Sequence, residues 1–313
     1  MALGESLSRA RVDELVRAAA RGERWLELDR GRFTTDYNRR PFVVRHRLPT
    51  HPRFALDALR ALCRRLPREQ VRYRVGAIAH DADFDHSLDA DRRGLTFDEA
   101  IDQLEDRRAY VAIYNPERDP TYRPVIEGLL GELATETELV EPGLNWYSTY
   151  VFISTEASVT PYHMDREMNF LLQIRGTKHA ELWDPRDDEV MSPAERDRLL
   201  TARDEPRPRW GDHLPAKAMA FELVPGTGVH HPFIAPHLVR TTSALSISLA
   251  ITFRTAQSDR WTAAHRFNHL VRTRLRLAPP VAVGVNPWVD HAKAAMVRGV
   301  TRLRAATRPP RAR

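Results

Sequence analysis

The chain has little cysteine, little lysine and no long apolar run. Cys63 is the only cysteine among 313 residues, which excludes an intrachain disulfide and a cluster of thiolate metal ligands. Any bound metal must therefore be held by nitrogen and oxygen atoms. No stretch is long and apolar enough to span a membrane, and the charged N-terminal residues do not form the hydrophobic segment of a signal peptide. We therefore expect a soluble, cytoplasmic protein that does not contact a membrane.

Basic charge comes almost entirely from arginine and is concentrated near the C-terminus. The chain has 45 arginines but only three lysines, Lys178, Lys217 and Lys293. The net charge is +6, yet residues 254–313 alone carry 13 basic and two acidic side chains, so the rest of the chain is acidic overall. Such a tail could contact nucleic acid or an acidic partner, or could be the solvated face of helices, and the sequence leaves these alternatives open.

The residue pattern changes twice along the chain and predicts three parts. Residues 1–141 mix amphipathic helical segments with strand-like ones, so we expect an N-terminal α/β elaboration packed on a core. Residues 142–257 contain many short segments rich in β-branched and aromatic residues, which predicts a mainly β core of the sandwich or barrel type. Residues 258–313 return to a helical period and predict two basic helices.

Two helix starts are marked by their capping residues. Thr96 is followed three residues later by Glu99, which is the spacing of a capping box. Ser192 precedes Pro193 inside the charged insertion at residues 186–215. We therefore expect a short helix directly after each of these two positions.

Two histidine-x-carboxylate triplets occur, in different settings. About 1.7 such triplets are expected by chance in a chain of this composition, with 13 histidines and 42 carboxylates, so the spacing alone is weak evidence. His163 and Asp165 stand directly before the apolar segment NFLLQI, where both side chains can converge on one ion from the end of a strand. His179 and Glu181 lie on the less apolar face of the next segment and should point outward. The first triplet is the better candidate for a metal chelate.

A third ligand must come from another strand, and the segment VPGTGVHHPFIAPHLVRT offers three histidines. His230 and His231 are neighbours, so at most one of them faces inward, whereas His237 follows a turn that contains proline. We favour His237 and keep His231 as the alternative. Two histidines and one carboxylate form the facial arrangement that binds non-haem Fe(II) and leaves positions open. A closed structural zinc site would need a fourth protein ligand.

The rarity of lysine makes Lys178 informative. Strand alternation places Lys178 on the same face as Ala180 and Leu182, which is the more apolar and so the inward face. A compact ammonium group at the inner end of a pocket suits the distal carboxylate of a dicarboxylate cosubstrate. The alternative is an ion pair with a neighbour such as Glu181 or Asp184.

The segments VTPYHMDREMNFLLQIRGTKHAELWDP, VPGTGVHHPFIAPH and SISLAITF together resemble the cupin-like JmjC hydroxylases. These are Fe(II)- and 2-oxoglutarate-dependent oxygenases, among them the asparaginyl hydroxylase of hypoxia-inducible factor. The resemblance covers residues 145–255 well and the N-terminal part loosely. It implies a double-stranded β-helix, the cupin or jelly-roll fold, with N-terminal helices and strands and a C-terminal helical pair.

The resemblance also implies roles for particular residues, beginning with the iron and the far end of the cosubstrate. Iron would be bound by His163, Asp165 and His237. The C5 carboxylate of 2-oxoglutarate would be bound by Thr160 and Lys178. No side chain beyond the metal ligands is expected to act as a general base.

Further residues are implied to surround the cosubstrate. Asn169 falls where the family has an asparagine near 2-oxoglutarate. Tyr110 corresponds to a tyrosine whose hydroxyl reaches the cosubstrate, with Tyr114 as the rival assignment. Tyr150 and Phe152 share a strand face that would line the pocket.

The activity implied by the resemblance is that of a dioxygenase that uses Fe(II), 2-oxoglutarate and dioxygen to hydroxylate a C–H bond. A peptide or protein side chain is the first expectation for the substrate, with N-demethylation or a small-molecule substrate as alternatives of the same class. A non-catalytic cupin binding module, with the basic tail docked on RNA or another partner, is the alternative from a different class. Homodimerisation through the C-terminal helices is expected because some relatives dimerise in this way.

Overall fold

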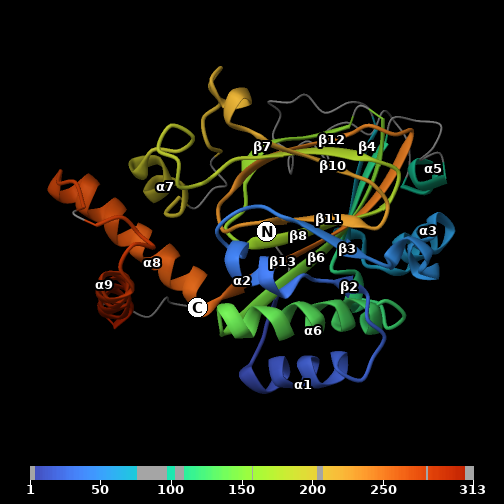
Figure 1. The fold of residues 1–313 in the computed structure, drawn as a ribbon, viewed down its shortest axis with the longest axis horizontal. Coiled ribbons are helices and arrows are strands. Elements are labelled where there is room, and N and C mark those ends of the chain that lie inside the picture. The colour runs from blue at the N-terminus through green and yellow to red at the C-terminus, as the bar shows by residue number, and fades with distance from the viewer. Residues whose placement is uncertain are drawn as a thin grey trace, which may run out of the picture.

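Two antiparallel sheets face one another at the centre of the molecule (Figure 1). The computed structural model describes residues 4–75, 97–102, 109–156, 158–202, 207–279 and 281–306. Within these residues the larger sheet has nine strands, in the spatial order β2 (Leu26–Glu27), β3 (Val43–His46), β11 (Thr227–His231), β8 (Met168–Arg175), β13 (Leu245–Thr255), β6 (Leu144–Thr155), β5 (Ala109–Tyr114) and β4 (Val71–Val75), with β1 (Glu5–Ser6) paired to β6. The smaller sheet has the order β10 (Met219–Leu223), β9 (Lys178–Leu182), β12 (Pro236–Thr241) and β7 (Val159–Met164).

The central strand β8 shows why the larger sheet is so apolar. Phe170 and Leu172 belong to the main hydrophobic core on the helix side, whereas Leu171 belongs to the small cluster between the two sheets. Both faces of the strand are therefore covered, and its first seven residues, including the polar Asn169 and Gln173, are all buried instead of alternating between buried and exposed. The inner cluster also contains Ala180, Leu182, Val229, Val239 and Ala250, which close the barrel interior.

Helices cover the outer face of the larger sheet (Figure 1). The long helix α6 (Arg123–Val140) packs on the sheet, and α1 (Arg9–Ala19) packs against α6. Gly131 lets the two helices approach closely, because a Cβ atom at this position would clash with the carbonyl oxygen of Leu15. The shorter helices α2 (Arg30–Asp36), α3 (Leu56–Arg65) and α5 (Phe97–Asp102) complete the described N-terminal part.

A second group of helices lies to one side of the barrel: α7 (Pro193–Leu199), α8 (Ala256–Leu270) and α9 (Pro287–Ala306) (Figure 1). Asp197 on α7 is only 1% exposed and accepts hydrogen bonds from His265 Nδ1 and from Arg272 Nε, each at 2.7 Å. This buried carboxylate ties the insertion at residues 186–215 to α8 and to the π-helical turn that follows it.

The fold class predicted from the sequence is confirmed: a mainly β double-stranded β-helix core carries N-terminal helices and strands and a C-terminal helical pair. Strands β2 to β5 extend the larger sheet, so the N-terminal part shares this sheet with the core. Ser192 caps α7 by accepting from the backbone N–H of Glu195, as expected, whereas Thr96 lies outside the described residues. No helix in the described parts of the chain is long and apolar enough to cross a membrane.

Candidate active site

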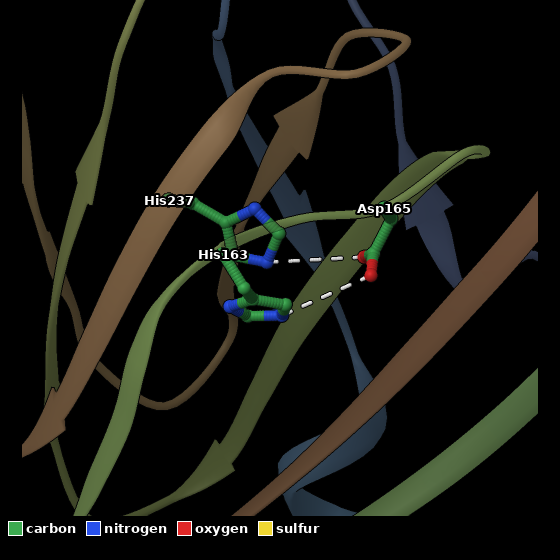
Figure 2. Close-up of side chains that lie close together, drawn as sticks. All are labelled: His163, Asp165 and His237. Atoms are coloured by element: carbon green, nitrogen blue, oxygen red, sulfur yellow. Dashed lines mark ion pairs between the residues drawn. The ribbon is translucent and has the colours of Figure 1, made fainter. Parts of the chain in front are cut away.

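His163 and His237 lie opposite each other on two neighbouring strands of the smaller sheet. Strands β7 and β12 pair with these residues in register, and the two ring centroids are 4.1 Å apart. Asp165 follows the end of β7, and its carboxylate lies beside both rings (Figure 2). Its Oδ1 is 3.8 Å from His163 Nε2 and its Oδ2 is 3.8 Å from His237 Nε2. The donor atoms of the three side chains all lie within 4.8 Å of one another.

The two imidazoles are oriented by the backbone. His163 Nδ1 donates to the carbonyl oxygen of Pro161 at 2.7 Å, and His237 Nδ1 donates to that of Ala235 at 3.0 Å. These bonds fix the tautomer and leave each Nε2 lone pair directed at the space beside Asp165. Burial, with the neighbouring His163, lowers the pKa of His237 well below its ordinary value, so its ring stays neutral and able to ligate.

The donor set fits a divalent first-row metal ion. Two atoms that each lie about 2.1 Å from one ion can be at most about 4.2 Å apart. The 3.8 Å separations between Asp165 and the two Nε2 atoms lie within this limit. Because only three protein ligands meet here among the described residues, an ion would keep coordination positions open toward the cavity.

A β-bulge brings Thr160 into the same cavity as His163. On β12, His237 and Val239 are two residues apart, but their partners on β7, His163 and Thr160, are three apart. The extra residue interrupts the alternation of side chains within β7. Thr160 and His163 are three residues apart and would face opposite sides of a regular strand, but here both face the cavity. Pro161, which cannot donate a ladder hydrogen bond, lies within the bulge.

A cavity of about 570 Å³ extends from these three side chains into the barrel. Every residue predicted for the site lines it: Tyr110, Tyr150, Phe152, Thr160, His163, Asp165, Asn169, Lys178 and His237. Tyr114, the rival to Tyr110, lines it as well. The volume lies in the range of small-molecule sites.

Lys178 is buried at the inner end of the cavity with 3% of its surface exposed. Its Nζ donates to Ser248 Oγ at 2.7 Å and lies 5.7 Å from the centroid of the Phe152 ring. Among the described residues it has no carboxylate partner, and burial lowers its pKa to about 7. A buried ammonium group in this state is stabilised by any anion that enters the cavity.

The second His-x-acid triplet faces outward. His179 pairs with Glu222 and Glu181, and Glu181 also pairs with Arg240, all on the outer face of the smaller sheet. Glu181 therefore forms its ion pairs on the opposite side of β9 from Lys178. The ion pair between Glu181 and Lys178, considered from the sequence, is not observed.

Aromatic side chains form one wall of the cavity. The rings of Tyr150 and Phe152 stack with centroids 5.9 Å apart and planes 3° from parallel. Tyr110 contacts Phe152, the ring that also contacts Lys178, whereas Tyr114 packs edge-on against Tyr150. Tyr110 is therefore the tyrosine on the lysine side of the cavity.

The structure separates the two adjacent histidines of β11. His230 lies on the helix side, where its ring nitrogens are bonded to the Asn169 carbonyl and the Asn38 N–H. His231 faces the cavity, with its ring 4.4 Å from that of His237. It does not belong to the three-residue group of metal donors. The sequence offered His231 only as an alternative ligand and gave no signal for a different role.

Similar folds occur among solved structures. The X-ray structure of E. coli YcfD is 15% identical and matches over 91% of this chain and 69% of that chain, with a TM-score of 0.46. The E. coli ribosomal oxygenase YcfD in complex with cobalt and 2-oxoglutarate is 15% identical and matches over 92% of this chain and 69% of that chain, with a TM-score of 0.42. No curated protein matches the chain.

The family model described as a cupin-like domain matches residues 36–306, which is most of the chain. The match includes the smaller sheet, the larger sheet apart from β1 and β2, and the C-terminal helices described above. This chain belongs to the family of cupin-like domains.

Proposed function

We propose that this protein is an Fe(II)- and 2-oxoglutarate-dependent oxygenase that hydroxylates a C–H bond. The observation that carries the proposal is the presence, in one cavity, of two histidines and one carboxylate at metal-binding distances together with the buried ammonium group of Lys178. A metal-binding cupin that used no dicarboxylate would leave that ammonium group buried without an anion. The proposed cosubstrate supplies this anion.

Each group of side chains has a distinct role in this proposal. Bound Fe(II) supplies the activation of dioxygen that is coupled to oxidative decarboxylation of 2-oxoglutarate. His163, Asp165 and His237 hold the ion on one side and leave its other side open to the cavity. Lys178 and Thr160 bind the C5 carboxylate and so fix the length and direction of the cosubstrate. No side chain is required to act as a general base.

The cavity walls control water and orientation. Tyr150 and Phe152 stack along one side, and Tyr110 closes that side near Lys178. Asn169 lines the cavity from β8. These groups exclude bulk water around the cosubstrate, which strengthens the electrostatic contacts made there.

The substrate that we propose first is a peptide or protein side chain, with N-methyl groups and small molecules as alternatives of the same chemistry. The basic side chains that line the cavity beyond Lys178 are Arg72, Arg166, Arg207, Arg254 and Arg266. Among the lining residues that the structure describes, Glu167 and Asp259 are the acidic ones besides Asp165. Basic side chains therefore outnumber acidic ones in the described part of the lining, which favours a substrate with negative groups beside the reactive carbon. Turnover of acidic peptides should exceed that of basic ones and should fall as salt is raised.

The enzyme class is tested with the purified chain. Anaerobic addition of Fe(II) and then 2-oxoglutarate should produce a weak visible absorption band, and admission of air should yield succinate. His163→Ala should lose both signals. His179→Ala, which changes the outward-facing triplet of the same spacing, is the matched control and should keep both. The proposal fails if His163→Ala keeps its activity, or if the two variants lose it equally.

The rival from another class is a cupin that only binds a partner. A chain that binds neither Fe(II) nor 2-oxoglutarate in the same titration would favour this rival. Binding of nucleic acid through the C-terminal region would then show a steep salt dependence. We propose the catalytic alternative because a binding module has no use for the converging metal donors.

We also propose that the C-terminal helices join two copies of the chain, in the cytoplasm, where 2-oxoglutarate is available. Among the described residues, large apolar side chains are exposed on α9 and just before it: Leu275, Leu277, Val285, Trp288 and Met296. Trp288 is 84% exposed. Exposed apolar side chains concentrated in one part of the chain favour a protein contact over a solvated face.

A further inference from the structure

His231 and the neighbouring His230 differ in the hydrogen bonding of their ring nitrogens, although both are buried on the same strand. Both residues lie at the end of β11 and both are buried, at 0% exposure for His230 and 2% for His231. His230 has a hydrogen-bonding partner at each ring nitrogen. His231 has none at either nitrogen among the described residues. A buried imidazole without partners is destabilising, so its retention calls for a group that enters the site.

A second side chain with an unpartnered polar atom lies on the neighbouring strand. Asn169 on β8 is the register partner of His231 on β11, and its Oδ1 is also buried without a hydrogen bond among the described residues. Thr252 on β13 is in turn the register partner of Asn169, and its hydroxyl donates to the Ser148 carbonyl. All three side chains line the cavity. They form a polar row across three adjacent strands, on the sheet that faces the metal donors.

The row meets the candidate metal centre at the His231 end. The ring of His231 lies 4.4 Å from that of His237 and almost perpendicular to it, at 70°. Its nitrogens are not part of the group whose donor atoms lie within 4.8 Å of one another, so it is not a fourth ligand in this geometry. Its location suits a hydrogen bond to an oxygen atom of a ligand that the metal holds.

We propose that the neutral ring of His231 donates an N–H hydrogen bond to an oxygen atom of a carboxylate ligand bound at the metal on the side of His237, in a subsite that Asn169 borders. The chemical class is a 2-oxo acid, whose adjacent carboxylate and keto oxygens can bind one ion while they accept from neighbouring N–H groups. A neutral imidazole has one donor and one acceptor nitrogen and can serve such an oxygen without changing the charge of the site. His231 is thus a binding residue for the metal-bound end, distinct from Lys178 at the opposite end. This inference rests on the proposed function.

The test measures binding with Co(II) in place of iron, so that no turnover occurs. His231→Leu removes both nitrogens at similar volume, and His231→Gln keeps a donor and an acceptor. His230→Leu is the matched neighbour, because it removes a ring whose nitrogens are both bonded. Co(II) affinity and 2-oxoglutarate affinity are determined by titration calorimetry, the Co(II) absorption bands are recorded, and the ligand-free proteins are compared by thermal unfolding.

We expect His231→Leu to bind Co(II) within about threefold of the wild-type affinity and to bind 2-oxoglutarate about tenfold or more weakly, since one hydrogen bond to a charged group is lost. His231→Gln should recover most of this affinity. Without ligands, His231→Leu should melt at or above the wild-type temperature, whereas His230→Leu should melt below it. The cobalt bands of His231→Leu with 2-oxoglutarate should differ from those of the wild type.

Three results would overturn the subsite. The first is an unchanged 2-oxoglutarate affinity in His231→Leu. The second is a loss of Co(II) affinity beyond tenfold in this variant, which would make His231 a metal ligand. The third is a melting temperature as low as that of His230→Leu, which would make His231 a structural residue. Failure of the proposed function is distinguishable from all three, because the wild-type protein would then not bind 2-oxoglutarate in the presence of Co(II).

Discussion

Replacement of Lys178 by methionine should stabilise the ligand-free protein and abolish cosubstrate binding. Methionine keeps the length of the side chain but removes the charge from a position that is 3% exposed. Among the described residues the ammonium group has one polar partner, the hydroxyl of Ser248 at 2.7 Å. A charge held in this way is costly unless an anion is present. The site is therefore a stability cost that the cosubstrate offsets.

The size of the effect follows from the pKa of Lys178. Burial lowers it from 10.5 to about 7, and this difference corresponds to about 5 kcal/mol between the charged and neutral forms. Below pH 7 the lysine is charged in both the folded and unfolded states, so the full penalty applies. Between pH 7 and pH 10.5 the folded protein has released the proton that the unfolded chain still holds, so stability rises by about 1.4 kcal/mol per pH unit. Above that range both states are neutral and the penalty disappears.

Urea unfolding of wild type and Lys178→Met across this pH range measures the difference directly. We expect the variant to be more stable by several kcal/mol at pH 7, and the advantage to shrink by about 2 kcal/mol by pH 9. With metal present in both proteins, saturating 2-oxoglutarate should raise the stability of the wild type by a further amount of about 3 kcal/mol at 100 times its dissociation constant, but should not raise that of the variant. A variant that is less stable at pH 7, or one that still binds 2-oxoglutarate with wild-type affinity, would refute this reasoning.

Three other perturbations test separate parts of the molecule. Asp197→Asn should destabilise the fold by about 3 kcal/mol in thermal unfolding, because it removes the buried carboxylate that accepts from His265 and from the guanidinium group of Arg272, whereas Asp57→Asn, at a side chain 93% exposed, should change stability by less than about 0.5 kcal/mol. Thr160→Val should raise the KM for 2-oxoglutarate about tenfold with little change in kcat, since the hydroxyl that we propose as a contact of the far carboxylate would contribute equally to ground and transition states. Trp288→Glu should shift the mass measured by light scattering from dimer to monomer without changing succinate formation, and an unchanged mass would exclude this surface as the contact.

The strand-rich core could be predicted from local pattern because its strands are short, apolar and punctuated by turn residues. Periodicity of two also separated Lys178 from His179, and the structure places these two side chains on opposite faces of β9. The metal donors could be proposed because a strand-end His-x-Asp pair needs only local geometry. The choice of His237 over His231 was harder, since it depends on which of two neighbouring sheets each histidine joins.

The inward placement of Thr160 could not be derived from alternation. Counting by twos from His163 reaches Pro161 and Val159, which would turn Thr160 away from the cavity. The bulge in β7 opposite β12 shifts the alternation by one residue, so Thr160 faces the cavity. The resemblance to the JmjC hydroxylases placed Thr160 in the site without indicating that a bulge is needed. In the residue pattern itself, only Pro161 indicated an irregularity in this strand. Bulges of this kind are set by the pairing of strands that are distant in sequence, so a local analysis does not reach them.

Whether the ring nitrogens of a buried histidine have hydrogen-bonding partners cannot be predicted from the sequence either. His230 and His231 have the same residue type, adjacent positions and nearly complete burial, yet one is bonded at both nitrogens and the other at neither within the described structure. The difference arises because β11 lies between helices on one face and the cavity on the other, so its alternate side chains meet different surroundings. Unpartnered buried polar atoms also occur away from the cavity, at Tyr37 and Asn268 for example, so the lack of a partner alone does not mark a binding site. His231 and Asn169 differ from these because they line the same cavity as the candidate metal donors, and His231 lacks a partner at both ring nitrogens among the described residues. It is this combination of a missing partner and a place beside the donors that points to a second molecule.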